Sequence, residues 1–95
     1  MFPVMSKFPL GRILGTPGAV STCREQSVSM FSLFQRHAQG DWGDVCEEDW
    51  ALNDLALADG DGRIFSSYEL PESGKVWVIT EADRSVTTLL LPEEY

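Results

Sequence analysis

Residues 75–81 read KVWVITE, and this segment decides the predicted fold. It is rich in β-branched and aromatic residues, which favour strands. Both of its faces are apolar, because two valines alternate with Trp77 and Ile79, and this pattern suits a central strand. Similar segments flank it, RIFSSYEL at 63–70 and VTTLLL at 86–91. The connecting turns are short and favour antiparallel pairing, so we expect a meander with 75–81 in its middle.

Two helices are expected before these strands. Thr16 followed by a proline is typical of a helix N-terminus and predicts a helix over 17–26. Ser27 is the expected cap of a second helix over 28–38, which a glycine ends. Residues 12–15 (RILG) are expected to form a short strand or an extended lead-in. The apolar stripe predicted for the second helix consists of Val28, Phe31, Phe34 and Ala38, flanked by Leu33.

A third helix is expected over 45–58, with Asp44 as its N-cap and acidic residues in its first turn. Leu52 and Leu55 supply its predicted inward stripe. Helices followed by strands predict an α+β domain. We therefore expect about three N-terminal helices packed on a C-terminal three- to four-stranded antiparallel meander.

The length and the charge restrict the class of protein. The 95 residues form one expected domain, 1–95, in which residues 1–7 are disordered or extended. Fifteen acidic and seven basic residues give a net charge of −8, which disfavours direct binding to nucleic acid. No apolar run is long enough to span a membrane, and no secretory signal is recognisable, so we expect a cytoplasmic protein.

The negative charge is concentrated in residues 41–61, which contain eight acidic residues and no basic one. Charged runs usually face solvent and keep a small protein soluble. Alternatively, the negative field attracts a basic partner, with Trp50 as an exposed apolar anchor. A buried Trp50 would instead pack against the corner around Trp42. The candidate partner-binding residues are Asp41, Asp44, Glu47, Glu48, Asp49, Trp50, Asp54, Asp59 and Asp61.

The sequence predicts no metal site and no cofactor. One histidine and two separated cysteines, Cys23 and Cys46, are too few for a structural zinc site. Both thiols are expected to be reduced and buried as small apolar side chains. The DGDG segment at 59–62 resembles part of a calcium-binding loop. However, that alignment places Leu57 and Tyr68 at the first and last ligand positions, where calcium needs carboxylates.

His37 is the single histidine and the side chain best suited to acid–base chemistry near neutral pH. We interpret it instead as a surface or capping residue at a helix C-terminus, where the dipole stabilises a cationic ring. Arg84 is expected to pair with a nearby carboxylate in the turn between the last two strands. If the protein were a small toxin-like ribonuclease, its acid–base and phosphate-contacting candidates would be His37, Arg36, Glu81 and Arg84.

Three sequence blocks together resemble a known family. The first is FPLG at 8–11 with TPGA at 16–19, and the second is RHAQGDWGD at 36–44. The third is ITEADRSVTT at 79–88, and the chain ends with LPEEY at 91–95. In this combination the chain resembles a family of small bacterial proteins carried on plasmids and integrative elements. The resemblance brings no activity and no catalytic residue with it.

This resemblance implies a mobile-element setting, in which small acidic proteins often block host defence. The family pattern has a polar or basic residue at position 50, so Trp50 is expected to be partly exposed. Our leading hypothesis is a non-enzymatic binding protein that engages a basic, nucleic-acid-binding surface of a host protein, such as a CRISPR–Cas or restriction component. The alternatives are the toxin-like ribonuclease and an element-maintenance scaffold protein. The sequence leaves the oligomeric state open.

Overall fold

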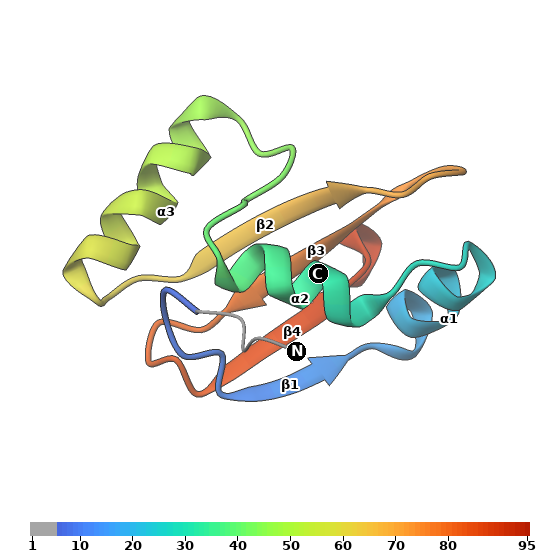
Figure 1. The fold of residues 1–95 in the computed structure, drawn as a ribbon, viewed down its shortest axis with the longest axis horizontal. Coiled ribbons are helices and arrows are strands. Elements are labelled where there is room, and N and C mark those ends of the chain that lie inside the picture. Colours follow the sequence, from blue (N-terminus) through green and yellow to red (C-terminus); the bar gives the residue numbers. More distant parts are fainter. Residues whose placement is uncertain (1–5) are drawn as a thin grey trace.

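The computed structural model describes residues 6–95, which form an α+β fold as predicted (Figure 1). Among these residues, no helix combines the length and the apolar character needed to cross a membrane. The expectation for residues 1–5 lies outside the described part. Ser6 and Lys7 have no regular structure, and the Lys7 N–H donates to the carbonyl of Ala38 at 2.8 Å. The elements in order are β1 (Arg12–Gly15), α1 (Pro17–Glu25), α2 (Met30–Ala38), α3 (Glu47–Asp59), β2 (Ile64–Glu69), β3 (Lys75–Thr80), β4 (Val86–Leu90) and the 3₁₀ turn η1 (Pro92–Glu94).

The sheet has the strand order β1-β4-β3-β2. Strands β2, β3 and β4 form the predicted antiparallel meander, and β3 lies between the other two. The RILG segment is a true strand, but it pairs with β4 in parallel, so the sheet is mixed and not purely antiparallel. Parallel neighbours require a long connection between them, and here all three helices and two strands lie between β1 and β4.

Helices α1 and α2 cover one face of the sheet (Figure 1). Helix α1 begins as predicted, because the Thr16 side chain accepts a hydrogen bond from the backbone N–H of Ala19. Helix α2 begins later than predicted, with Ser29 as its N-cap. Ser27 cannot cap the helix, since it has a φ of 56° and belongs to the turn after α1. Phe31 is 68% exposed, although the sequence placed it in the inward stripe, because α2 turns the face that carries Leu33, Phe34, His37 and Ala38 toward the sheet.

The core has two parts on the helix-covered face. The larger part lies beneath α1 and α2, and a smaller cluster lies beside α3. The larger cluster contains Ala19, Cys23, Leu33, Phe34, Tyr68, Leu70, Val76, Val78 and Leu89. The smaller cluster contains Phe8, Trp42, Ala56 and Ile64. Trp42 closes the smaller cluster, and its side chain is fully buried.

The outer edge of β2 is hydrogen-bonded along its length, although β2 is the last strand of the sheet. The Asn53 side chain accepts from the N–H of Phe65 at 3.0 Å and donates to its carbonyl at 2.6 Å. The N–H of Ser67 donates to the carbonyl of Trp42, and its carbonyl accepts from the N–H of Asp44. These bonds block the edge against pairing with another chain.

Gly43 makes this edge contact possible. It has a φ of 75°, a left-handed conformation that favours glycine, and it forms a bridge with Ser67. A Cβ atom at this position would collide with the carbonyl of Ser67 and the ring of Tyr68. Residues 41–44 (DWGD; hereafter the DWGD segment) therefore form a short strand-like stretch that is hydrogen-bonded to β2, and not only a corner.

The edge bonds predict a specific stability effect. Asn53→Ala leaves the partly buried N–H and carbonyl of Phe65 without the partners that Asn53 provides and should lower the free energy of unfolding by about 1–3 kcal/mol. Leu55→Ala in the same helix is the control, and it should change stability by less than about 0.5 kcal/mol because Leu55 is 57% exposed. Urea denaturation of both variants measures the difference. A larger loss for Leu55→Ala would show that the leucines, not Asn53, attach α3 to the sheet.

Candidate functional site

Helix α3 lies beside β2 (Figure 1). Most of its acidic residues are exposed to solvent. Its N-cap is Cys46, whose side chain makes no capping hydrogen bond. Asp44, the predicted cap, instead accepts a hydrogen bond from the N–H of Glu69 at 3.2 Å. Carboxylates in the first turn interact favourably with the N-terminal end of the helix dipole. The acidic residues of that turn are Glu47, Glu48 and Asp49.

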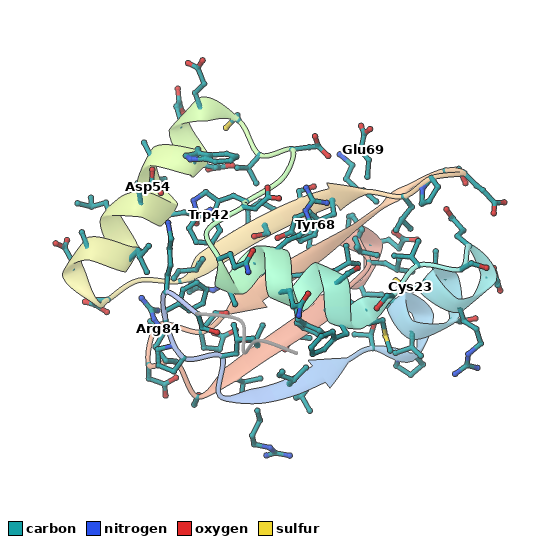
Figure 2. All side chains as sticks on the ribbon, in the orientation of Figure 1. Cys23, Trp42, Asp54, Tyr68, Glu69 and Arg84 are labelled. Atoms are coloured by element: carbon teal, nitrogen blue, oxygen red, sulfur yellow. The ribbon has the colours of Figure 1, made fainter. Side chains whose placement is uncertain are left out.

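Several of the predicted partner-binding acids have structural roles instead. Asp41 forms an ion pair with Arg36 at 2.7 Å, and this hydrogen bond lowers the pKa of the Asp41 carboxyl. Asp54 accepts a hydrogen bond from Nε1 of the buried Trp42 at 3.1 Å (Figure 2). Asp61 accepts a bond from the next backbone N–H. Together with Asp44, these carboxylates hold the segment around α3 in place.

Four predicted acids remain available to a partner. Within residues 6–95, none of these four side chains makes a hydrogen bond or an ion pair. Three of them are exposed and the fourth, Asp49, is half-buried. They are Glu47, Glu48, Asp49 and Asp59.

Trp50 is partly exposed, as expected, with 38% of its surface accessible. Helical spacing places Glu47 one turn before it and Asp54 one turn after it on the same side of α3. The indole therefore lies between carboxylates at the surface. This is the arrangement that the sequence predicted for an apolar anchor in an acidic field.

The prediction that Leu52 and Leu55 face inward is wrong. They are 61% and 57% exposed, whereas Asn53 and Ala56 of the same helix are buried. The physical reason is that α3 packs beside a strand edge, where the backbone of Phe65 needs hydrogen bonds that Asn53 supplies and that a leucine side chain cannot. Turning Asn53 toward β2 turns the two leucines outward.

The outward leucines border a groove of about 370 Å³ between α3 and the start of β2. Its apolar floor has acidic residues at its border, and one basic residue, Arg63, closes it. The sequence pattern contained this signal, because Leu52 and Leu55 lie among acids. However, the spacing of the two leucines is also typical of an inward core stripe, so the sequence alone does not reveal the groove. The residues that line the groove are Leu52, Leu55, Ala56, Asp59, Asp61, Gly62 and Arg63.

His37 is not a surface or capping residue, contrary to the sequence interpretation. Its side chain is fully buried, with edge-on contacts to the rings of Phe8 and Trp42. Burial lowers the pKa of the imidazole from 6.5 to about 3, so the ring is neutral at physiological pH. The helix dipole was expected to stabilise a cationic ring, but it does not do so here, because a protonated imidazole in this buried position would lose its hydration.

Both ring nitrogens of His37 are held by hydroxyl groups. Nδ1 lies 2.6 Å from Oγ of Ser66, and Nε2 lies 2.9 Å from Oγ1 of Thr80. The hydroxyl of Thr87 donates to the carbonyl of Leu10, so it must accept from Thr80 at 2.7 Å. Thr80 then accepts from Nε2, which assigns the proton to Nε2 and leaves Nδ1 to accept from Ser66. The donor and the acceptor of each hydrogen bond in this buried series are thus assigned, and His37 has a structural role.

The structure does not gather the four ribonuclease candidates into one site. His37 is enclosed, whereas the Arg36 guanidinium pairs with a surface carboxylate and stacks over the ring of Tyr68. The predicted pairing of Arg84 with a carboxylate is wrong, because Arg84 forms no ion pair within residues 6–95. It donates to backbone carbonyls, at 2.6 Å to Gly62 and at 3.2 Å to Ala56, and so ties the β3–β4 turn to the end of α3.

The remaining candidate, Glu81, pairs with Arg63 at 3.8 Å. Arg63 in turn lies over the ring of Tyr95, beside a shallow depression of about 280 Å³ on the sheet face opposite α1 and α2. The residues that line it are Arg63, Phe65, Trp77, Ile79 and Tyr95. Helices cover the face of KVWVITE that carries Val76 and Val78, whereas Trp77 and Ile79 lie on the opposite face and border this depression.

No group of three or more histidine, cysteine or acidic side chains in residues 6–95 could hold a metal ion. The DGDG segment ends α3, and Gly60 at its C-cap has the left-handed conformation. Cys23 is buried as expected, and burial raises the pKa of its thiol. Cys46 is exposed, contrary to expectation, because it lies at the N-terminus of α3 rather than beneath it. Both cysteines are free thiols.

Comparison of the chain with protein-family models, with curated proteins and with solved structures finds no significant match.

The buried His37 predicts a pH dependence of stability. The unfolded chain gains a proton near pH 6.5, while the folded chain resists protonation until about pH 3, so stability falls as the pH falls between these values. At pH 5 this residue should cost about 2 kcal/mol relative to pH 7.

The His37→Gln variant keeps a polar side chain but removes the titrating ring, so it separates this effect from that of the carboxylates. Urea denaturation at pH 7 and pH 5 should show a loss for the wild type that exceeds the loss for His37→Gln by about 2 kcal/mol. Equal losses in the two proteins would mean that His37 is accessible to protons in the fold.

Proposed function

We propose that this chain is a non-enzymatic binding protein of a mobile genetic element, and that α3 engages a basic surface of a host protein. One observation carries the proposal. A single helix presents carboxylates that have no hydrogen-bonding or ion-pair partner within residues 6–95, beside exposed apolar side chains. These apolar side chains are Trp50, Leu52 and Leu55.

The charge favours a basic partner. The chain has a net charge of −8, and the stretch 41–61 contains no basic residue to neutralise its own acids. Carboxylates that have no partner in the described part of the chain keep their full attraction for lysine and arginine side chains. Such a field increases the rate at which a basic protein is captured.

The exposed apolar side chains supply what the carboxylates lack. Exposed ion pairs contribute little affinity, because water and salt screen them. Burial of an aromatic side chain at the centre of an interface commonly contributes most of the binding energy. Trp50 and the Leu52–Leu55 pair lie on different sides of α3, so a partner that grips the helix from outside can contact both.

A nucleic-acid-binding surface of a host protein has the required chemistry. Such surfaces gather lysine and arginine to hold phosphates, with apolar or aromatic groups among them. The acidic face of α3 offers them carboxylates in place of phosphates. The resemblance to plasmid and integrative-element proteins points to a partner in host defence, namely a CRISPR–Cas or restriction component, which this chain would inhibit by occupying its nucleic-acid site.

Reversal of the charges of Glu47 and Glu48 tests the electrostatic part of the proposal. The tagged chain is used to isolate its partner from the bacterial host, and binding kinetics are then measured with the purified partner. The double variant Glu47→Lys with Glu48→Lys should slow association by roughly tenfold at low salt and weaken its salt dependence. Asp54 stays unchanged, because it holds Trp42.

The matched control is Glu25→Lys with Glu72→Lys, which changes the net charge equally at exposed positions away from α3. This control variant should reduce the rate of association with the partner far less. Addition of DNA or RNA should release the captured partner, because both compete for one basic surface. Equal effects of the two double variants, or a partner that nucleic acid does not displace, would overturn the proposal and favour a scaffold role.

Removal of the aromatic anchor tests the apolar part. Trp50→Ala should increase the dissociation rate and cost about 2 kcal/mol of binding free energy, a loss of roughly 30-fold in affinity. Phe31→Ala is the control, since Phe31 is also exposed and aromatic but lies on α2. Melting temperatures of both variants should stay near that of the wild type. If phage or plasmid restriction in a defended host is relieved equally by wild type and Trp50→Ala, Trp50 is not an anchor.

A further inference from the structure

Strand β1 is the one open edge of the sheet in the described part of the chain. All four of its residues are exposed. The N–H of Arg12 donates to the carbonyl of Ser85, just before β4, at 2.9 Å. The N–H of Thr16 donates to the carbonyl of Leu89, within β4, at the same distance. Along a strand that pairs in parallel, the backbone N–H and carbonyl groups of successive residues point alternately toward the neighbouring strand and away from it. The N–H and carbonyl groups of Ile13 and Gly15 therefore face away from the sheet.

The side chains of β1 do not protect this edge. Ile13 is 52% and Leu14 is 41% exposed, and Arg12 is the only ionisable residue of the strand. Proteins usually guard an edge strand with lysine, proline or a bulge, because free backbone groups invite another strand. The opposite edge, β2, is covered by Asn53 and the DWGD segment, so the contrast lies within one sheet.

We propose that two copies of this chain form a dimer by antiparallel pairing of their β1 strands. Each sheet has a single open edge, so pairing between identical edges closes at two copies and cannot continue into a filament. With Leu14 opposite Leu14 of the second copy at the two-fold axis, Ile13 and Gly15 exchange main-chain hydrogen bonds in both directions. The two leucines then cover each other on one face of the joined sheet.

Charge complementarity supports a second copy as the occupant. In the same register Arg12 lies opposite Thr16 of the second copy. The Thr16 hydroxyl donates to the carboxylate of Glu94 at 2.5 Å, which holds that carboxylate at the end of β1. Arg12 makes no ion pair with any residue of 6–95. The two-fold axis thus brings each Arg12 toward a Glu94 of the other copy.

The position of the acidic helix also favours this arrangement. Helix α3 lies along β2, at the edge of the sheet farthest from β1 (Figure 1). Pairing through β1 places the two α3 helices at opposite ends of the dimer, where their like charges are far apart and screened by salt. A dimer joined through any face near α3 would instead bring the charges together.

The mass in solution, measured by sedimentation velocity from about 1 µM to about 200 µM, tests the dimer through its dependence on concentration. Wild-type chain should approach twice the monomer mass at the upper concentrations. Ile13→Pro removes the outward N–H without removing a bond to β4, so this variant should remain monomeric while its circular dichroism stays native. A wild type that is monomeric over the whole range would overturn the proposal.

A charge reversal tests the register and does not depend on a proline substitution. Arg12→Glu places two carboxylates together across the axis and should weaken dimerisation by roughly tenfold or more. Arg24→Glu gives the same change in net charge on the exposed surface of α1 and should weaken it far less. Equal weakening by both variants, or a dimer that survives Ile13→Pro with unchanged affinity, would show that the copies associate elsewhere.

Discussion

The hydrogen-bonding requirement of the outer edge of β2 determines how the rest of this structure is arranged. An edge strand carries backbone N–H and carbonyl groups that need partners when they are buried. Asn53 meets that need at Phe65, and the DWGD segment meets it at Ser67. Helix α3 must then turn Asn53 toward the strand, and its leucines and free carboxylates turn outward. The acidic, partly apolar surface of the protein is a consequence of this packing.

A second set of polar contacts holds the helix-covered face together. The buried chain from Ser66 through His37, Thr80 and Thr87 to the carbonyl of Leu10 links α2 to three strands and to the lead-in of β1. Thr80 and Thr87 each donate one hydrogen bond and accept one, and Ser66 donates to His37, so these bonds fix the relative position of the elements as well as their contact. Histidine fits here because a neutral imidazole can both accept and donate across one side chain.

The sequence predicted the elements whose signals are local. The alternating apolar pattern of KVWVITE identified the central strand, and Thr16 with the following proline located the start of α1. It failed where a distant partner decides the outcome. Leu52 and Leu55 have the spacing of an inward stripe, but the backbone of Phe65 selects Asn53 instead. His37 looks like a helix-end cation until Ser66 and Thr80 are seen to enclose it. The nine predicted site residues lie in one acidic stretch, and no local pattern distinguishes Asp54, which holds Trp42, from Glu47, which has no partner in residues 6–95.

The two proposed contact surfaces lie at opposite edges of the sheet, α3 along β2 and the open backbone of β1. A dimer formed through β1 therefore presents two α3 surfaces facing outward, which lets it bind two sites of a repetitive or dimeric partner with increased avidity. Residue-by-residue amide exchange measured by NMR tests the constraint behind this arrangement most directly. The amides of Phe65, Ser67 and Glu69 should exchange about a hundredfold or more slower than those of the 71–74 turn, although they face outward from the last strand. Exchange at the rate of that turn would contradict the claim that α3 and the DWGD segment hold the β2 edge.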